Sequence, residues 1–380
     1  MSRLSLFVFI DALGWKILNQ HSFLDDVLKL KQPLNTVFGY SSTCDPTIIT
    51  GLDPQEHGHF SFFYFDPENS PFWWARYLDV LPRSLTSRGR VRHWISKIAG
   101  KLLGYSGYFQ LYNMPFSKLH YFNYSEKKDI YRRGGINSGA ESVFVQLEAE
   151  GVPFHLSDWR QGEEQNLQSL SQAMSGPDKP TVAYLYLAAM DAVLHAHGTG
   201  APQVAEKMRW YDEKLRRLLD EADKNYSEVR LFIFSDHGMT DVNSTLDLIP
   251  KVESLGYQFG RDYAAVYDST MARFWFSNAS AEADVRTLLE STPGGRLLSD
   301  RQLAAYRCFF PDRKYGHLFY LLDPGVLLCP SFMGEKPLAG MHGYDPLHQD
   351  SVASFSTNTE VDWPRDLKDL HGLIRSEARA

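Results

Sequence analysis

Three apolar runs along the chain each lead to a side chain that can bind a metal ion or carry a proton. Each run is short, continuous and rich in β-branched or aromatic residues, which is typical of a strand buried on both faces of a parallel sheet. The runs are Leu4 to Ile10, Pro180 to Ala188 and Val229 to Phe234, and they are followed by Asp11, by Asp191 and by the pair Asp236-His237. Ligands of open α/β sheets bind beyond the carboxyl ends of the strands. We therefore expect these carboxylates to meet in one place.

The rest of the chain predicts an α/β fold. Residues Pro202 to Lys224 repeat apolar side chains with a helical period, and Pro202 suits the first turn of a helix. A further short strand is expected at Val152 to Leu156. The 380 residues fit a single domain, residues 1–380, built on a mostly parallel central sheet flanked by helices. Residues 68–135 hold many aromatic and basic side chains without a clean period, and we expect an inserted cap or lid there.

The composition narrows the class of partner. The formal net charge of −7 argues against a nucleic-acid partner, because nucleic-acid binding needs a basic surface. No apolar run approaches the ~20 residues that a membrane span requires, and the N-terminal run is too short for a signal peptide. Three cysteines without a close pair predict no disulfide framework. We expect a cytoplasmic protein with no membrane partner, and no feature of the sequence indicates an oligomeric state.

Six side chains have the chemistry of metal ligands. A cluster of carboxylates is unfavourable unless cations neutralise it, and Asp and His are suitable ligands for Zn²⁺ or Mn²⁺. Three acids and three imidazoles would serve two metal sites with three protein ligands each, with open positions left for a substrate. We expect two divalent metal ions as cofactors, Zn²⁺ in the first place and Mn²⁺ as the alternative. The six candidates are Asp11, Asp191, His195, Asp236, His237 and His342.

Five motifs follow one another along the chain. They are Thr50-Gly-Leu-Asp-Pro-Gln-Glu-His-Gly58, Phe65-Asp-Pro67, Asp191-Ala-Val-Leu-His-Ala-His-Gly198, Ser235-Asp-His-Gly-Met-Thr240 and His342-Gly-Tyr-Asp345. The first matches T-G-L-x-P-x-x-H-G, the third matches D-x-x-G-H-x-x-G except at its first Gly, and the last two match S-D-H-G-M-T and H-G-Y-D in full. In these motifs the chain resembles the alkaline phosphatase superfamily, and within it the nucleotide pyrophosphatase/phosphodiesterase branch.

The resemblance implies a division of the six ligands between two sites. One metal ion would be held by Asp191, His195 and His342, and the other by Asp11, Asp236 and His237. The fold that the resemblance implies is the α/β fold of alkaline phosphatase, in agreement with the strand pattern above.

The resemblance also points to a nucleophile. In this superfamily the nucleophile usually lies nine residues before the Thr of the Thr-Gly pair, and counting back from Thr50 gives Ser41. A second sequence pattern of the superfamily places the nucleophile two residues before a proline, and this pattern points to Cys44 instead. Thr43 is a further candidate, so three side chains remain open for this role.

The local structure around the nucleophile is also open at this point. A helix beginning at Ser42 would contain Pro46, which lacks an N–H and crowds the preceding turn. A helix beginning at Pro46, with Asp45 as its N-cap, is the rival geometry.

Two departures from the resemblance bear on the substrate. The phosphodiesterase branch normally carries an Asn after its His-Gly, where it helps to hold a phosphate oxygen, and the equivalent here is Phe62. A sulfatase whose cysteine is modified needs C-x-P-x-R, and Ile48 stands where that Arg belongs. The grip on the phosphate therefore differs from that of the branch, and a sulfatase is disfavoured.

The leading interpretation is a two-metal hydrolase, a phosphodiesterase or phosphatase. It would cleave a phosphodiester or phosphate ester of a small metabolite, of nucleotide or nucleotide-sugar type, through a covalent phospho-enzyme. Its partner would be that small phosphorylated substrate. Two rivals share the same residues: a phosphotransferase or mutase with the same metal site, and a non-catalytic binding protein of the same fold.

Overall fold

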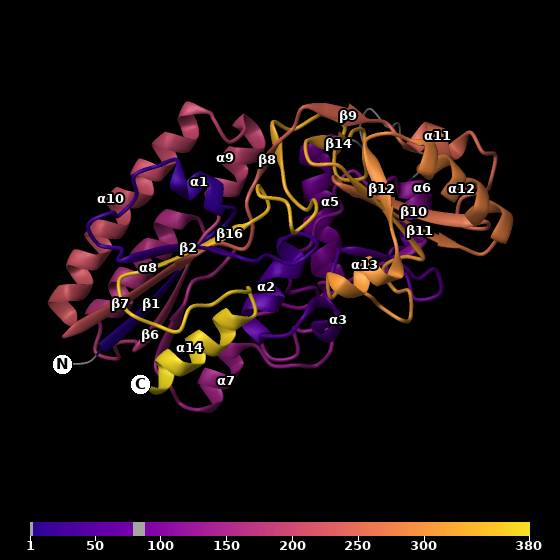
Figure 1. The fold of residues 1–380 in the computed structure, drawn as a ribbon. Helices are drawn as coiled ribbons and strands as arrows, with labels where there is room; N and C mark the ends of the chain where they lie inside the picture. Colours follow the sequence, from indigo (N-terminus) through magenta and orange to yellow (C-terminus); the bar gives the residue numbers. More distant parts are fainter. Residues whose placement is uncertain (1–2, 79–87) are drawn as a thin grey trace.

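A six-stranded mixed sheet forms the centre of one lobe of the computed structural model, which describes residues 3–78 and 88–380 (Figure 1). In sheet order the strands are β2 (Leu30–Leu34), β16 (Ala353–Thr357), β7 (Glu228–Phe234), β1 (Arg3–Ile10), β6 (Val182–Leu187) and β5 (Phe154–Leu156). The last four are parallel neighbours, whereas β16 is antiparallel to both β7 and β2. The mostly parallel sheet expected from the sequence is confirmed.

The side chains of β1 alternate between two separate cores. Leu6 and Val8 pack into the core on one face of the sheet, and Phe7 and Phe9 pack into the core on the other. Because both faces are covered by helices, the strand is apolar at successive positions rather than at every second one. This burial explains why the run is readable from the sequence alone.

Helices cover both faces of this sheet. One face carries α1 (Trp15–Asn19), α8 (Glu163–Ser175), α9 (Ala189–His197) and α10 (Pro202–Asn225). The other carries α2 (Ser41–Thr50), α7 (Val143–Ala149) and α14 (Asp369–Arg379). Figure 1 shows α10 along the outer edge of the lobe and α14 beside α7 near the C-terminus. The amphipathic helix expected from Pro202 onward corresponds to α10.

A smaller antiparallel sheet forms the second lobe. Its order is β10 (Tyr263–Tyr267), β11 (Met271–Phe276), β13 (Leu318–Leu322) and β12 (Gly295–Leu298). The helices of this part of the chain are α11 (Ile249–Glu253), α12 (Ala279–Ser291) and α13 (Asp300–Ala305). Short strands join the lobes: β8 (Thr240–Asp241) pairs with β15 (Gly340–Met341), and β9 (Ser244–Leu246) pairs with β14 (Val326–Leu328).

The segment expected to form a cap packs onto the second lobe. Two short elements precede the segment: α3 (Pro54–His57) and β3 (Phe63–Phe65). The described elements of the segment itself are η1 (Trp73–Tyr77), α5 (Gly89–Leu102), α6 (Phe116–Leu119) and β4 (Phe122–Tyr124). Phe122 lies edge-on to Trp275 of β11, with ring centroids 6.1 Å apart. Residues 79–87 of the predicted cap lie outside the described residues. A lid function of residues 68–135 stays a prediction.

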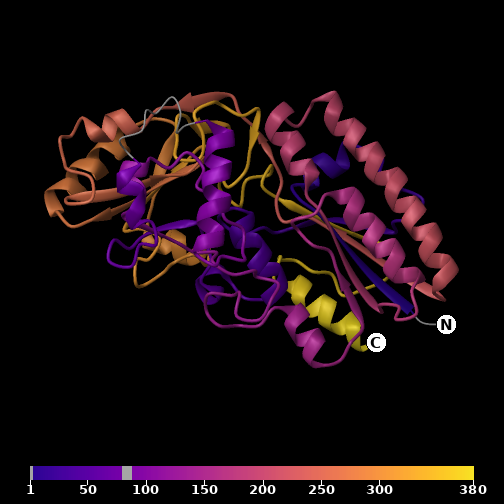
Figure 2. The same cartoon turned by 180° about the vertical axis from the view of Figure 1, so that it is seen from behind.

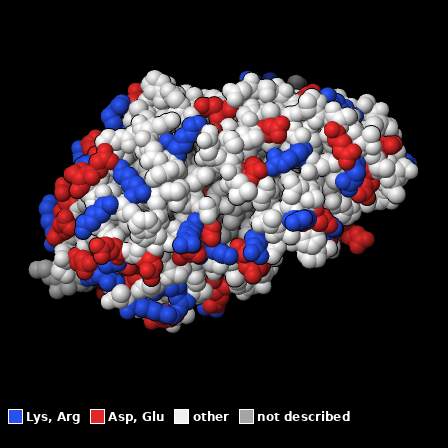
Figure 3. Space-filling model, viewed as in Figure 1, with Lys and Arg blue, Asp and Glu red and all other residues white. Residues whose placement is uncertain are grey.

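The surface carries charges of both signs. In the view of Figure 3, Lys and Arg side chains alternate with Asp and Glu, most densely over the helical side of the first lobe.

Among residues 3–78 and 88–380, no helix combines the length and the apolar character needed to cross a bilayer.

Glu377 connects α14 to the central sheet. Its carboxylate accepts hydrogen bonds from Ser5 Oγ at 2.8 Å and from Arg230 Nε and Nη2 at 2.9 Å each. Glu377 is buried, so these bonds replace the water that its charge would otherwise bind.

We predict that Glu377→Gln destabilises the fold. The amide keeps the shape of the side chain but loses the charge, so the free energy of unfolding should fall by about 1–3 kcal/mol. Urea denaturation measures the loss. Glu148→Gln, at an exposed position on the neighbouring α7, is the matched control and should unfold with the wild type. Equal stability of both variants would contradict the role given to Glu377.

Candidate active site

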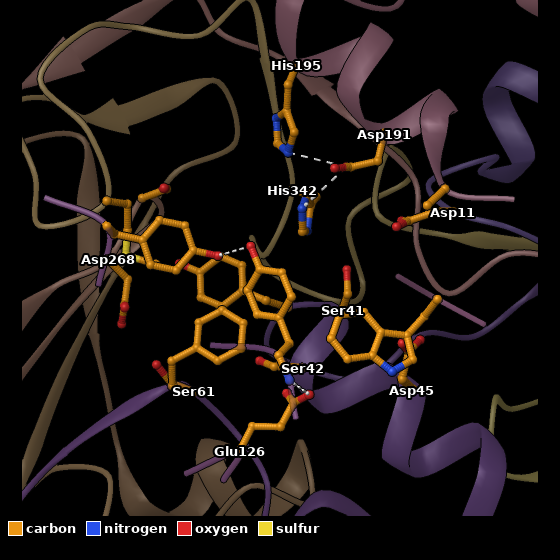
Figure 4. Close-up of a pocket in the computed structure, with 18 of the residues that line it drawn as sticks. Asp11, Ser41, Ser42, Asp45, Ser61, Glu126, Asp191, His195, Asp268 and His342 are labelled. Carbon is orange, nitrogen blue, oxygen red and sulfur yellow. Dashed lines mark hydrogen bonds and ion pairs between the residues drawn. The ribbon is translucent and has the colours of Figure 1, made fainter. Parts of the chain in front are cut away.

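The acidic side chains predicted from the sequence lie together at the carboxyl ends of three parallel strands. Asp11 directly follows β1, Asp191 lies in the first turn of α9 after β6, and the Asp236-His237 pair follows β7. His342 comes from the other direction, directly after β15. The close-up in Figure 4 shows Asp11, Asp191, His195 and His342 on the same side of one cavity.

One group of potential ligands is centred on Asp191. His195 Nε2 lies 3.2 Å from Asp191 Oδ1, and His342 Nε2 lies 3.6 Å from the same oxygen. His195 Nδ1 lies 2.8 Å from the carbonyl oxygen of Gly340. A ring whose Nδ1–H donates to a carbonyl presents Nε2 as a ligand, which is the usual arrangement around a bound metal. The ligand atoms of Asp191, His195 and His342 lie within 4.8 Å of one another.

A second group overlaps the first. Asp11, Asp191 and His237 also place ligand atoms within 4.8 Å of one another, so Asp191 belongs to both groups. The resemblance places Asp236 in this set, and Asp236 Oδ2 lies 3.0 Å from His237 Nε2. Asp236 Oδ1 accepts hydrogen bonds from the backbone N–H of Ala12 at 3.1 Å and of His237 at 3.0 Å. Only Oδ2 of Asp236 is therefore left to bind an ion.

The electrostatics of the cluster are unfavourable without a cation. Burial and the carboxylates of Asp236 and Asp191 raise the pKa of Asp11 well above its ordinary value. Burial, together with the nearby His237, lowers the pKa of His342 well below its ordinary value. Burial opposes protonation of His237, yet the adjacent Asp236 carboxylate raises its pKa to about 9. Like-charged groups forced together in this way are typical of sites that hold metal ions.

Several buried oxygens of the cluster have no hydrogen-bond partner within the described residues. They are Asp11 Oδ1, Asp191 Oδ1 and Asp236 Oδ2. Protonated imidazoles would pair with two of these oxygens, since His195 Nε2 lies 3.2 Å from Asp191 Oδ1 and His237 Nε2 lies 3.0 Å from Asp236 Oδ2. Buried polar atoms are nearly always paired, so in the unprotonated state of these rings all three oxygens require another partner. Divalent cations would satisfy all three, and the combination of carboxylates and imidazoles fits Zn²⁺ or Mn²⁺.

Ser41 is the first residue of α2 and faces the cluster. Its Oγ lies 3.1 Å from His237 Nε2. Pro46 lies inside α2, so the rival geometry, a helix that begins at Pro46, is wrong. The helix tolerates the proline because Ile48 and Ile49, two and three residues later, are fully buried in the core under the sheet.

The two alternative nucleophiles are buried and contact other groups. Thr43 is fully buried, and its hydroxyl donates to the carbonyl oxygen of Phe60 at 2.6 Å. Cys44 is buried against Thr36, with Sγ 3.7 Å from Oγ1, and burial raises the pKa of its thiol. Neither side chain lines the cavity, whereas Ser41 does.

Comparison with known proteins agrees with this geometry. The family model described as type I phosphodiesterase / nucleotide pyrophosphatase matches residues 6–345. The chain belongs to this family. It is therefore a member of a family of phosphoric ester hydrolases, as the motifs predicted. A search of the curated proteins returned no match.

Solved structures of phosphodiesterase-family proteins share the fold. Murine ectonucleotide pyrophosphatase / phosphodiesterase 5 has a TM-score of 0.71 at 16% sequence identity, over 99% of this chain and 95% of that one. The inactive murine protein in complex with AMP gives 0.71 at 16% identity, over 100% and 95% of the chains. The human protein gives 0.70 at 15% identity, over 99% and 95%. At such low identity the likeness concerns the fold alone.

The phosphodiesterase-family site opens into a cavity of about 510 Å³ with an aromatic wall. Phe62, the residue that replaces the Asn of the branch, stacks on Tyr108 and Tyr112 with ring centroids 5.4 and 5.8 Å apart. The hydroxyls of these two tyrosines are 3.1 Å apart. Trp159 continues the wall, 6.1 Å from the ring of Tyr108. The volume is in the range of small-molecule sites.

Three acids of the cavity were missed by the sequence reasoning. Asp45, Glu126 and Asp268 line it, and burial raises the pKa of each, to about 8 for Glu126. Figure 4 shows Asp45 near Ser41, with Glu126 and Asp268 across a group of aromatic rings from Asp191. Only Asp45 carried a local signal, because it lies one helical turn after Ser41. No motif marks Glu126 or Asp268.

We predict that Asp191 helps to bind both metal ions, whereas His195 helps to bind only one of them. Asp191→Asn should purify without bound Zn²⁺ or Mn²⁺, and added Zn²⁺ should no longer raise its Tm. His195→Ala should keep part of the metal and part of the Tm increase, because the Asp11 group remains. Elemental analysis and thermal unfolding measure both effects. Asp191→Asn with wild-type metal content would contradict the shared-ligand geometry.

Proposed function

We propose that this phosphodiesterase-family protein is a two-metal hydrolase that cleaves a small phosphodiester or phosphate ester through a covalent phospho-enzyme on Ser41. The observation that carries the proposal is the position of Ser41 Oγ, 3.1 Å from His237 Nε2 and beside buried carboxylates without hydrogen-bond partners among the described residues. Two divalent cations held by this cluster would lower the pKa of a hydroxyl and stabilise charge on the phosphoryl group. Zn²⁺ is our first choice and Mn²⁺ the second.

The chain's own residues orient the two displacement steps. Ser41 Oγ attacks phosphorus, the Oγ–P bond forms, the bond to the leaving group breaks, and the Ser41 proton is transferred to the departing alcohol. A water molecule then attacks phosphorus, the Oγ–P bond breaks, and one proton of that water returns to Ser41 Oγ. Ser41 and Ser42 form the first turn of α2, where the N–H groups of a helix favour an anion. These N–H groups supply donors to the phosphoryl oxygens in a site that has Phe62 in place of the Asn.

The lining of the cavity supports a substrate with a single phosphate and a flat aromatic substituent. Among the described residues that line it there is no Lys or Arg, and Asp45, Glu126 and Asp268 are acids. A chain of further phosphates would find no basic side chain in this lining to offset its charge, and it would oppose ionisation of the nearby Asp45 and Glu126. Phe62, Tyr108 and Trp159 offer ring faces on which a nucleobase stacks. We therefore propose a nucleotide-type monophosphate diester rather than a nucleotide sugar.

Removal of the nucleophile tests the first step. Ser41→Ala should reduce kcat by roughly 10³-fold or more while bound metal stays at the wild-type content. Mass spectrometry of wild-type protein, quenched in acid during turnover of bis-p-nitrophenyl phosphate, should find the adduct on the Ser41 peptide. Thr43→Ser and Cys44→Ala are the matched controls and should stay active. An active Ser41→Ala with an inactive Cys44→Ala would move the nucleophile to Cys44.

The aromatic wall should set substrate preference. p-Nitrophenyl thymidine 5′-phosphate should have a kcat/KM at least about tenfold above that of methyl p-nitrophenyl phosphate, because stacking of a base on aromatic rings contributes about 1–3 kcal/mol. Trp159→Ala should reduce this ratio with little change in the rate on the methyl ester. The exposed Trp363, which does not line the cavity, provides the control variant Trp363→Ala. A ratio that is unchanged in Trp159→Ala would contradict the proposed substrate class.

The two rivals predict different products. A phosphotransferase would pass the phosphoryl group to an added alcohol such as glycerol, whereas a hydrolase releases it to water. We expect the hydrolysed product to dominate in the presence of glycerol, as measured by phosphorus NMR. Metal binding without release of p-nitrophenol from either ester would favour the non-catalytic binding protein.

A further inference from the structure

Helix α5 exposes a stripe of large apolar side chains to solvent and buries two of its polar side chains. Trp94, Ile98 and Leu102 are 67%, 56% and 82% exposed, whereas Arg92 and Ser96 are buried. Residues four apart lie on one side of a helix, so the three apolar side chains form a single stripe. A surface helix normally buries such a stripe. An exposed stripe of large apolar side chains indicates an interaction surface.

Polar contacts under the helix hold it in this orientation. Arg92 Nη1 donates to the carbonyl oxygen of Met114 at 2.6 Å, and its guanidinium lies 4.0 Å from the ring centroid of Phe116. Ser96 Oγ accepts a hydrogen bond from the N–H of Leu111 at 3.0 Å. Rotation of α5 to bury the stripe would break these buried bonds. The exposure of the stripe is therefore fixed by the packing of the inner side.

Basic side chains lie beside the stripe. Arg90, Lys97 and Lys101 are exposed and fall within about 60° of Trp94 around the helix axis. The helix contains no Asp or Glu, although the whole chain has a formal net charge of −7. The apolar stripe and the basic row together make one surface, here named the α5 face and composed of Arg90, Trp94, Lys97, Ile98, Lys101 and Leu102.

A neighbouring segment adds exposed aromatic side chains. Trp73 and Tyr77 of η1 are each 60% exposed. Phe72, just before η1, stacks on Phe109 with ring centroids 5.9 Å apart, and Phe109 contacts Gly100 of α5. Trp and Tyr favour the boundary between water and lipid, where the ring is in an apolar layer and its polar atom stays wet. In Figure 2, α5 faces the viewer on the outer surface between the two lobes.

We propose that the α5 face docks the protein on an anionic membrane surface. A helix of this kind lies in the plane of the interface, with Trp94, Ile98 and Leu102 in the headgroup layer. The long side chains of Lys97 and Lys101 reach outward to lipid phosphates while their stems stay on apolar surface. This proposal replaces the expectation, drawn from the absence of a spanning segment, that the protein has no membrane partner.

A second copy of the chain fits the α5 face less well. In a twofold dimer the same patch meets itself, so the row of Arg90, Lys97 and Lys101 would face an identical row. Like charges brought together across an interface oppose association. An anionic lipid surface has the opposite charge and an apolar layer beneath it, which matches both parts of the face.

Sedimentation with vesicles tests the proposal on the full chain and needs no catalytic activity. The wild type should bind vesicles of phosphatidylcholine mixed with phosphatidylglycerol, should bind phosphatidylcholine alone much more weakly, and should dissociate at high salt. The double variants Lys97→Glu with Lys101→Glu, and Ile98→Ser with Leu102→Ser, should each lose roughly tenfold or more in partition coefficient. Lys224→Glu and Leu347→Ser change exposed residues elsewhere and should bind as the wild type does.

The other outcomes overturn the proposal. Failure of the wild type to bind anionic vesicles, or wild-type binding by both double variants, would exclude a membrane-docking role for the α5 face. A dimer in analytical ultracentrifugation that Ile98→Ser with Leu102→Ser dissociates, together with no vesicle binding, would assign the face to a second copy. Circular dichroism and the Tm of each variant verify the fold, which should be unchanged because every substituted residue is exposed.

Discussion

Repulsion among three carboxylates gathered at one end of the central sheet is the constraint around which the site is organised. Asp11 and Asp236 follow the adjacent parallel strands β1 and β7, and Asp191 lies in the first turn of α9 after β6, so the fold holds the three close together. Burial strengthens the repulsion, as the raised pKa of Asp11 indicates. Without metal ions, protons offset part of this charge, since the Asp236 carboxylate raises the pKa of the adjacent His237 to about 9. The fold therefore favours bound cations, and cations in turn make a phosphate ester the natural ligand.

The second lobe contributes side chains to the lining of the cavity. Phe62 and Asp268 come from this side of the molecule and line the same cavity as the cluster of candidate metal ligands. Arg273 forms a fully buried ion pair with Asp268 and donates to Ser61 Oγ at 2.8 Å, so this wall is rigid. Where the phosphodiesterase branch has an Asn, the chain has an aromatic stack. The chain thus combines the fold of the family and the Asp/His cluster with an aromatic cavity wall at Phe62, in the position where the resemblance leads us to expect an Asn.

The sequence predicts the parts of the structure whose signals are local. The runs ending at Asp11 and Asp236 correspond to β1 and β7, because a strand buried on both faces is apolar at successive positions. The antiparallel lobe was not predictable in detail, since its short strands pair across long separations in sequence. Pro46 suggested a helix start, but burial of the residues that follow it overrides that local preference. Glu126 reaches the cavity only through tertiary packing, so no spacing could reveal it.

The central claim is that the carboxylate cluster holds two divalent cations that Ser41 needs for hydrolysis. The most direct test is the metal content of the purified wild-type chain, determined on the same sample that is assayed with bis-p-nitrophenyl phosphate and p-nitrophenyl phosphate. The account predicts two ions of Zn²⁺ or Mn²⁺ per chain, hydrolysis of the diester, and loss of both metal and activity after chelation, with recovery when metal is returned. Hydrolysis that persists in fully metal-free protein, or no metal binding at any added concentration, would contradict it.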